Sequence, residues 1–209
     1  MQTGQESDDD AGPRIWGGTT LTERRQARRA ALLEAALDLI GESGAAGVTM
    51  RAVCRRANLT DRYFYESFTS RDELLDQLYR QVADEFLEPM TAFAATDDPA
   101  RDHALSEVLV DKVLADPRKS RLFLVEPYSS TGLGQTTIAV MPVFTRLMQD
   151  HLFAHIEDPV RRRLAAVTMA SGNAGMFSAW LNGSLRATRE EIIDHCAETI
   201  AVYRRLYRS

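Results

Sequence analysis

Side chains able to contact the edges of DNA bases gather between residues 60 and 71 of this 209-residue chain. The guanidinium group of Arg62 can form two hydrogen bonds to the O6 and N7 atoms of guanine in the major groove. The Asp61 carboxylate can accept a hydrogen bond from the N4 amino group of cytosine. This stretch therefore has the chemistry to read base pairs, and we expect Arg62 to be its principal base-reading residue.

Other side chains near this stretch are suited to holding the DNA backbone. Tyr65, Arg71 and the hydroxyl groups of Thr49 and Thr60 can bond to phosphate oxygens, contacts that position a protein without reading sequence. The alternative is a solvated helical face, the more common fate of an isolated group of charged residues. The candidate DNA-contacting residues are Thr49, Thr60, Asp61, Arg62, Tyr63, Tyr65, Ser67 and Arg71.

Short helices joined by tight turns are predicted to position these residues. Apolar residues recur at spacings of three and four over residues 30–40, which predicts a helix that ends near Gly44. Thr49 is a good N-cap for a second helix, and Asn58 suits the left-handed backbone that a tight turn requires.

A third helix is predicted to begin after Thr60, whose hydroxyl can cap it. Phe64 and Phe68 are one helical turn apart, so both can anchor the helix in a core. That arrangement leaves Arg62 and Tyr65 on the outside, where DNA could be reached.

The charge of the chain is unevenly distributed. The net charge is −5, which taken alone argues against a nucleic-acid partner, because Lys and Arg supply most of the affinity for phosphates. Nine arginines, however, lie between Arg24 and Arg71, while the acidic excess lies at the extreme N-terminus and beyond residue 72. A basic head on an acidic body fits a modular DNA-binding protein.

Beyond residue 70 the sequence is predicted to be helical. A fourth helix is expected to begin after Ser70 and to be closed by Pro89 and a turn at residues 96–99. Leu122–Val125 is the only run with some β character, so we predict an all-α fold. Side chains that could line an apolar pocket between these helices, although each is more often ordinary core, are Phe123, Tyr128, Met141, Phe144, Met148, Met176, Phe177 and Trp180.

Other kinds of chemistry have little support. His151 and His155 stand one helical turn apart, which could place both on one metal ion, but no clear third ligand accompanies them. The sequence has no Gly-rich phosphate loop, nucleophile elbow or His-Glu metalloprotease motif. Cys54 and Cys196 lie in apolar helical patterns and are expected to be buried free thiols. We therefore predict no catalytic residue, no metal and no cofactor.

The N-terminus differs in composition from the rest of the chain. Its first 20 residues combine Gly, Pro, Ser and Thr with three consecutive Asp, which is typical of a disordered tail. It lacks the basic and apolar segments of a secretory signal, and no later stretch is apolar for long enough to span a bilayer. We expect a cytoplasmic protein with no membrane partner.

The segment Val48–Leu75 resembles the DNA-binding signature of the tetracycline-repressor (TetR) family of transcriptional regulators. That signature has a threonine-capped helix, a tight turn, a recognition helix ending in Tyr and Phe, and a basic residue near a Leu-Leu pair. Three positions depart from it: Asn58 replaces the usual Gly, Arg62 a small residue, and Ser67 a His or Tyr that often touches a phosphate. The matching residues are Thr49, Ala52, Ala57, Leu59, Thr60, Tyr65, Phe68, Ser70, Arg71, Glu73, Leu74 and Leu75.

The resemblance implies a regulator, in most of the family a repressor, that binds a double-stranded DNA operator as a homodimer and responds to a small, largely apolar ligand. In that architecture the last two helices pair with those of a second subunit, and residues 160–181 and 188–207 occupy their places. The first of these segments is rich in small residues around Gly172, which permits close approach of helices. Packing within one chain would use the same residues. The alternatives to a regulator are a helical enzyme and a protein–protein adaptor.

The predicted organisation has four regions. A disordered tail covers residues 1–20, and a three-helix helix-turn-helix domain covers 21–69. A connecting helix and linker follow over 70–99, and a helical ligand-binding and dimerisation domain covers 100–209.

Overall fold

The computed structural model describes residues 20–92, 100–129 and 134–207, with side chains described for 20–89, 100–127 and 140–207. Every regular element in those ranges is helical and none is a strand, which confirms the predicted all-α fold. Residues 1–19, which hold most of the predicted disordered tail, and the predicted turn at 96–99 lie outside the described residues.

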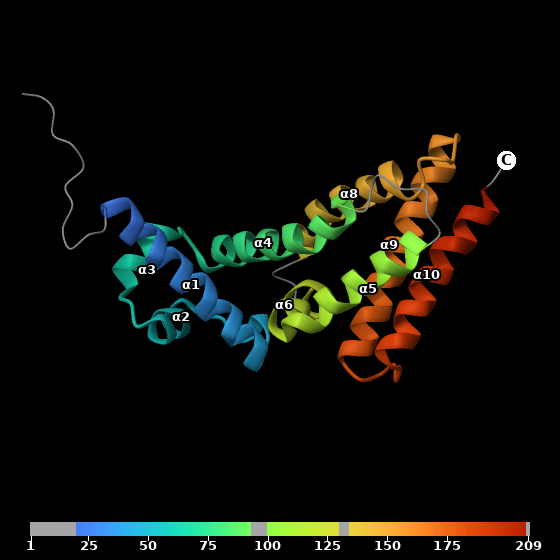
Figure 1. The fold of residues 1–209 in the computed structure, drawn as a ribbon. Helices are drawn as coiled ribbons and strands as arrows, with labels where there is room; N and C mark the ends of the chain where they lie inside the picture. The colour runs from blue at the N-terminus through green and yellow to red at the C-terminus, as the bar shows by residue number, and fades with distance from the viewer. Residues whose placement is uncertain (1–19, 93–99, 130–133, 208–209) are drawn as a thin grey trace, which may run out of the picture.

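The molecule is elongated, with two lobes joined by one long helix (Figure 1). We call the smaller lobe the head and the larger lobe the body, and α4 (Arg71–Ala92) runs from one to the other. The head consists of α1 (Leu21–Ser43), η1 (Ala45–Gly47), α2 (Met50–Ala57) and α3 (Asp61–Ser67). The body consists of α5 (Ala100–Ala115), α6 (Pro117–Ser120), η2 (Arg121–Val125), α7 (Glu126–Ser129), α8 (Gly134–His151), α9 (Pro159–Leu181) and α10 (Arg189–Leu206).

Capping residues set the ends of the helices in the head. Thr20 and Glu23 form a reciprocal capping box at the start of α1, which satisfies two backbone amides that lack helical partners. Gly44 ends α1 with a φ of 74°, a conformation that suits a residue without a Cβ. The Ser70 hydroxyl accepts from the Glu73 amide at 3.1 Å, so it caps α4 as predicted.

One expectation about the other helices needs correction, and the run with some β character is helical as the all-α prediction requires. Pro89 does not close α4, which continues to Ala92. Phe86 and Leu87 are buried beside it, so packing of this end of the helix offsets the backbone hydrogen bond that proline removes. The run with β character belongs to η2, a π-helical stretch in which Leu122 and Leu124 are buried and Phe123 is half-buried. Burial therefore alternates from one residue to the next along this helical stretch, a pattern that is more usual for a strand.

The apolar core is continuous between head and body. One cluster of buried residues includes Leu37 and Phe64 of the head, Tyr79 of α4, and Leu122 and Phe177 of the body. A second cluster fills the far end of the body, where α5, α8, α9 and α10 contribute side chains. The head is therefore packed against the body through α4, α6 and η2.

Candidate functional site

The second and third helices of the head form a helix-turn-helix. Asn58 lies between them with φ 52° and ψ 44°, the left-handed conformation expected from the sequence. The Leu59 amide donates to the Cys54 carbonyl at 2.9 Å and closes the turn. The Thr49 hydroxyl accepts from the Ala52 amide at 3.2 Å, as predicted for an N-cap. These contacts hold α3 in a set orientation relative to α2.

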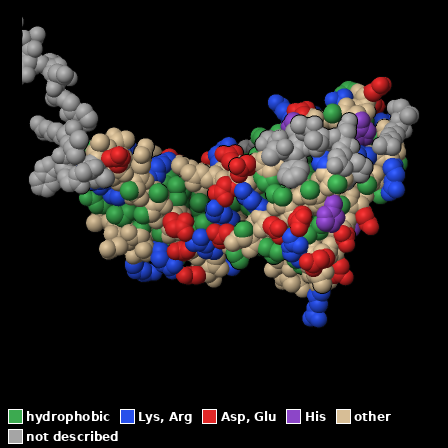
Figure 2. Space-filling model, viewed as in Figure 1, with side chains coloured by type: hydrophobic (Ala, Val, Ile, Leu, Met, Phe, Trp, Pro, Cys, Tyr) green, Lys and Arg blue, Asp and Glu red, His purple; other side chains and the backbone are tan. Residues whose placement is uncertain are grey.

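Helix α3 has one buried face and one exposed face. Phe64 and Phe68 are each 1% exposed, and their ring centres lie 5.8 Å apart. The side chain of Arg62 is 84% exposed, and Tyr65 is 60% exposed. Figure 2 shows Lys and Arg side chains along the edge of the head where Figure 1 places α2. The exposed side of α3 thus lies beside further positive charge.

Glu66 contacts three arginines around α3, of which Arg25 and Arg62 are exposed and Arg28 is half-buried. Its carboxylate accepts from Arg62 Nε at 2.9 Å and lies 3.9 Å from Arg28 Nη2. Its carbonyl accepts from Arg25 Nη2 at 2.8 Å, and the Arg28 guanidinium lies 4.3 Å from the centre of the Tyr63 ring. Exposed ion pairs add little stability, so their main effect is to restrict where Arg62 points. Sequence reasoning missed Glu66, although a spacing of four from Arg62 signals such a pair.

The N-terminal end of α3 is open to solvent. Thr60 has the extended backbone of an N-cap, but its side chain makes no capping hydrogen bond. Asp61 is also exposed and lies close to the thiol of Cys54. Burial, and to a smaller extent the Asp61 carboxylate, raise the pKa of that thiol. The predicted burial of Cys54 is confirmed.

Ser67, a candidate phosphate contact, faces the interior in this structure. It is 9% exposed, its hydroxyl oxygen is buried, and its carbonyl accepts from the Arg29 guanidinium. The reason is position, because Ser67 follows the buried Phe64 by three residues and so shares its face of α3. Its hydroxyl is therefore not placed to meet a phosphate.

Arg71, another candidate phosphate contact, is engaged with the protein backbone. Its Nε donates to the Val48 carbonyl and its Nη2 donates to the Ala45 carbonyl, both at 2.6 Å. These bonds tie the first residue of α4 to the segment that precedes α2. Arg71 thus acts in this structure as a brace between α4 and the helix-turn-helix.

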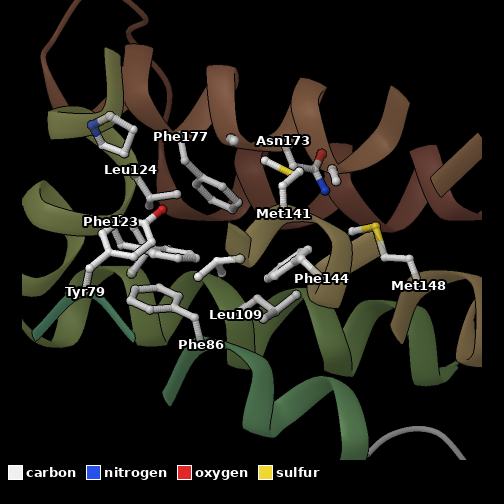
Figure 3. Close-up of a pocket in the computed structure, with 15 residues that line it drawn as sticks. Tyr79, Phe86, Leu109, Phe123, Leu124, Met141, Phe144, Met148, Asn173 and Phe177 are labelled. Atoms are coloured by element: carbon white, nitrogen blue, oxygen red, sulfur yellow. The ribbon is translucent and has the colours of Figure 1, made fainter. Parts of the chain in front are cut away.

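A cavity of about 90 Å³ lies in the body, between α4, α5, η2, α7, α8 and α9 (Figure 3). Its walls are almost entirely apolar, and they come from segments separated by up to about a hundred residues of sequence. The described residues that line it are Tyr79, Phe86, Leu109, Val113, Phe123, Leu124, Pro127, Val140, Met141, Phe144, Met148, Ala170, Asn173, Ala174 and Phe177.

Some of the residues predicted to line a pocket do so and others do not. Met176 and Trp180 point elsewhere and pack against the cluster that joins head and body. The Trp180 Nε1 donates to the Ala187 carbonyl at 2.8 Å, which turns the indole toward the end of α9. The side chain of Tyr128 lies outside the described residues. The predicted residues that line the cavity are Phe123, Met141, Phe144, Met148 and Phe177.

Two aromatic residues of α4 contribute to the cavity and were not predicted to do so. The ring centre of Phe123 lies 5.4 Å from that of Tyr79 and 4.8 Å from that of Phe86. The spacing of seven between Tyr79 and Phe86 indicates a shared helix face but not what that face contacts. The helix that leaves the head therefore forms part of the cavity wall.

The segment from η2 to α7 contacts the head on its other side. Pro127 lines the cavity, while the neighbouring Glu126 is 4% exposed and accepts from the Ala45 amide at 3.0 Å. Arg121 Nε donates to Glu126 at 3.1 Å, and its Nη1 donates to the Gly41 carbonyl at 3.2 Å. We call this set of bonds between Arg121, Glu126 and the head the latch. It connects body and head in addition to α4 and to the ion pairs of Arg118 in α6 with Glu34 and Asp38 in α1.

The outer surface of α9 and α10 exposes apolar and small residues. Leu164 of α9 and Leu206 of α10 are 59% and 69% exposed. A Cβ added at Gly172 or Gly175 would meet no other atom within 4 Å. The small residues predicted for close helix packing thus include glycines that face open space in the single chain.

The described residues give no support to a metal site or a membrane span. They contain no group of three or more His, Cys, Asp or Glu side chains able to hold a metal ion. His151 ends α8, and its carbonyl accepts from Arg101 at 3.1 Å. Within the part of the chain that the structure describes, no helix is long and apolar enough to cross a membrane.

Comparisons with known proteins agree with this architecture. Residues 32–78 match the family described as bacterial regulatory proteins, tetR family. Over 168 residues the chain is 30% identical to the HTH-type transcriptional regulator BetI of Burkholderia thailandensis, covering 77% of this chain and 84% of BetI. The FadR regulator of Bacillus subtilis, solved with stearoyl-CoA, has a TM-score of 0.68 at 16% identity and covers 82% of this chain and 96% of its own. NalD of Pseudomonas aeruginosa has a TM-score of 0.67 at 18% identity, covering 87% and 97%.

A helix-turn-helix head, joined by one helix to an all-helical body with an apolar cavity, defines a class of DNA-binding regulators. The chain belongs to the TetR family of transcriptional regulators. It is therefore a DNA-binding transcription factor, as predicted, and not an enzyme.

Proposed function

We propose that this regulator is a repressor that binds its operator as a homodimer and leaves it when a small, largely apolar molecule enters the body. The observation that carries the proposal is the course of α4. Its first residue, Arg71, braces the helix-turn-helix, while Tyr79 and Phe86 on the same helix line the cavity. NalD is described as the secondary repressor of a multidrug efflux pump, which fits repression. A regulator of this kind would act in the cytoplasm, where it can reach DNA.

The exposed face of α3 is the surface that we propose enters the major groove. Arg62 would leave Glu66 to pair with a guanine, and Asp61 could accept from a cytosine. Thr49, Thr60, Tyr63 and Tyr65 lie around them and would hold phosphates; Tyr65 and the two threonines are exposed. The ion pair with Glu66 keeps the Arg62 side chain on the exposed face of α3 in the free protein, and the high exposure of Arg62 supports its access to DNA.

Electrophoretic mobility shifts with genomic fragments test DNA recognition. We expect a subset of fragments to bind selectively, with an affinity that falls steeply as salt rises. Arg62→Ala should weaken binding to a selected fragment by about 1–3 kcal/mol and relax the preference at one base pair per half-site. Arg80→Ala is the matched control, because Arg80 is also exposed and pairs with Asp76 one helical turn away on α4.

The outcome separates two roles for Arg62. An equal loss on selected and random DNA would make Arg62 a phosphate contact and would overturn its role as base reader. Binding of every fragment with equal affinity would contradict sequence-specific regulation itself.

The outer surface of α9 and α10 is the surface that we propose for dimerisation. Operator half-sites in successive major grooves lie roughly 34–36 Å apart, which one recognition helix cannot span and two related subunits can. The exposed Leu164 and Leu206, with the open glycines of α9, support this surface.

Gly172→Trp tests the dimer interface with little risk to the fold. An added side chain meets no atom within 4 Å in the single chain, so overpacking would arise only against a second subunit. Sedimentation should show a dimer for the unmodified protein and a monomer for Gly172→Trp, with unchanged helix content. Val143→Trp, on the exposed side of α8, is the control and should remain dimeric. A monomer for the unmodified protein at micromolar concentration would contradict the interface.

Release from the operator follows in this proposal from movement of α4 and of the latch. A ligand that displaces Phe86 of α4 or Phe123 of η2 would change the spacing of the two recognition helices. The reason is that α4 continues into the head and the η2–α7 segment bonds to the head through the latch. Linkage requires that DNA weaken ligand binding by the same factor as ligand weakens DNA binding. Equal ligand affinity for free and DNA-bound protein would contradict this coupling.

A further inference from the structure

The cavity contains a polar side chain with no hydrogen-bond partner among the described residues. Asn173 lies on α9 within a stretch of wall formed by Ala170, Ala174 and Phe177. Figure 3 shows its amide on the cavity side of α9, beside Met141. Asn173 is half-buried, so its amide borders the apolar wall without being cut off from solvent. A ligand that covers the amide must supply a hydrogen-bonding group, because an amide covered by apolar atoms and left unpaired costs free energy.

The rest of the described wall carries no charge. Tyr79 supplies the other polar atom, and no Asp, Glu, Lys, Arg or His is among the described residues that line the cavity. An ion moved from water into such a wall loses its hydration without meeting a counter-ion. The wall therefore selects against charged molecules.

Asn173 lies where two apolar spaces meet. A second cavity of about 20 Å³ extends toward α10, where Cys196 and Ile200 line it. The two cavities share four lining residues, namely Leu109, Met148, Asn173 and Phe177. A ligand that bonds to Asn173 thus has apolar space on both sides of the bond.

The space in this structure is small, and its walls contain side chains that can adapt. A cavity of about 90 Å³ is smaller than the roughly 150 Å³ cavity that accepts benzene. Met141 and Met148 are unbranched and change rotamer readily, so they can enlarge it. A ligand of ten heavy atoms needs more space than this, so its binding should displace side chains of the wall. Some of these side chains belong to α4 and η2, and ligand binding would therefore shift both elements.

We propose that the ligand is an uncharged, elongated and largely apolar molecule with one hydrogen-bonding group near its middle, such as a ketone, a secondary alcohol or a secondary amide, held by Asn173. The inference rests on the proposed function only in treating this cavity as the site of the effector.

A set of molecules of nearly equal size, each with about nine or ten heavy atoms, tests the ligand class. The probes are 5-nonanone, 2-nonanone, nonane, the dibutylammonium cation and the 2-propylpentanoate anion. Binding is followed on the full-length protein through the ¹³C-methyl signals of Met141 and Met148, which report from the cavity itself. We expect 5-nonanone to bind about 3-fold more tightly than 2-nonanone and at least 10-fold more tightly than either ion.

Variants at Asn173 test the hydrogen bond. Asn173→Leu keeps the volume and should weaken 5-nonanone by about 3- to 10-fold while leaving nonane unchanged or tighter. Asn173→Asp should raise the affinity for dibutylammonium above that of the unmodified protein, because it supplies the missing counter-ion. The second variant keeps the test decisive if the first does not fold.

Three results would overturn the proposal: equal binding of 5-nonanone and dibutylammonium, no effect of Asn173→Leu on 5-nonanone, or no shift of the two methyl signals with any probe. Mobility shifts on the same preparation separate this failure from failure of the proposed function. Selective DNA binding without ligand binding would reject the ligand class and leave the regulator intact, whereas loss of selective DNA binding would reject the proposed function.

Discussion

The head and the body present functional surfaces of opposite character. The exposed face of α3 is convex and polar, comes from one helix of seven residues, and has ion pairs around Glu66. The cavity is concave and apolar, and six elements contribute to it. A charged surface can change in the head without disturbing the core beneath it, whereas any change of the cavity wall alters packing. Mutations should therefore separate function from stability in the head and couple them in the body.

The largest expected effect is loss of the core under α3. Phe64→Ala removes a fully buried ring and should lower the free energy of unfolding by about 3–5 kcal/mol. Phe123→Ala should cost less, because Phe123 is half-buried and already borders empty space. Tyr65→Ala, on the exposed face, should change stability by no more than about 0.5 kcal/mol.

Denaturant unfolding followed by circular dichroism measures all three variants. Equal losses for Phe64→Ala and Phe123→Ala would break the contrast between a filled core in the head and a cavity wall in the body. A large loss for Tyr65→Ala would show that the exposed face of α3 is not independent of the core.

The success of sequence reasoning follows the same contrast. In the head, Thr49, Asn58, Phe64 and Phe68 lie where the spacing predicts, because caps, tight turns and helix faces depend on residues a few positions away. The fold class was predictable for the same reason, since helical periodicity is local.

Sequence reasoning does not anticipate the contacts that a side chain makes with distant partners. Arg71 has the right type for a phosphate contact, yet its partners are the backbone carbonyls of Ala45 and Val48, some 25 residues away in sequence. Met176 and Trp180 have the right type for a cavity wall but do not line it. Trp180 even shares the helix face of Asn173 and Phe177, but it lies further toward the end of α9, where its indole bonds to the Ala187 carbonyl. Where along a helix face the empty space lies depends on how several helices pack, and periodicity does not contain that information.

The latch between head and body should give the second-largest effect. Glu126→Ala leaves the Ala45 amide without its acceptor and should cost about 1–3 kcal/mol. Glu126→Gln keeps an acceptor of the same shape and should cost less. Hydrogen exchange should show faster exchange of the Ala45 amide in Glu126→Ala, while amides in the middle of α10 are unchanged. Uniform acceleration over the whole chain would show that Glu126 supports the global fold and does not specifically join body to head.

The smallest expected effect compares the two thiols, one in each lobe. Burial raises the pKa of Cys196 in the body to about 11, from an ordinary value of 9.0. The folded state then keeps a proton that the unfolded state loses above pH 9, so stability present at pH 8 is lost as pH rises toward 11. Between pH 8 and pH 10 this loss amounts to about 1 kcal/mol, at roughly 1.4 kcal/mol per pKa unit.

Unfolding measured at both pH values should show this extra loss of stability in the unmodified protein and not in Cys196→Ala. Cys54→Ala is the control from the head, where burial also raises the thiol pKa, with a smaller contribution from the charge of Asp61. If the pH dependence persists in Cys196→Ala and disappears in Cys54→Ala, the more strongly perturbed thiol lies in the head. That result would contradict the assignment of the stronger burial effect to the body.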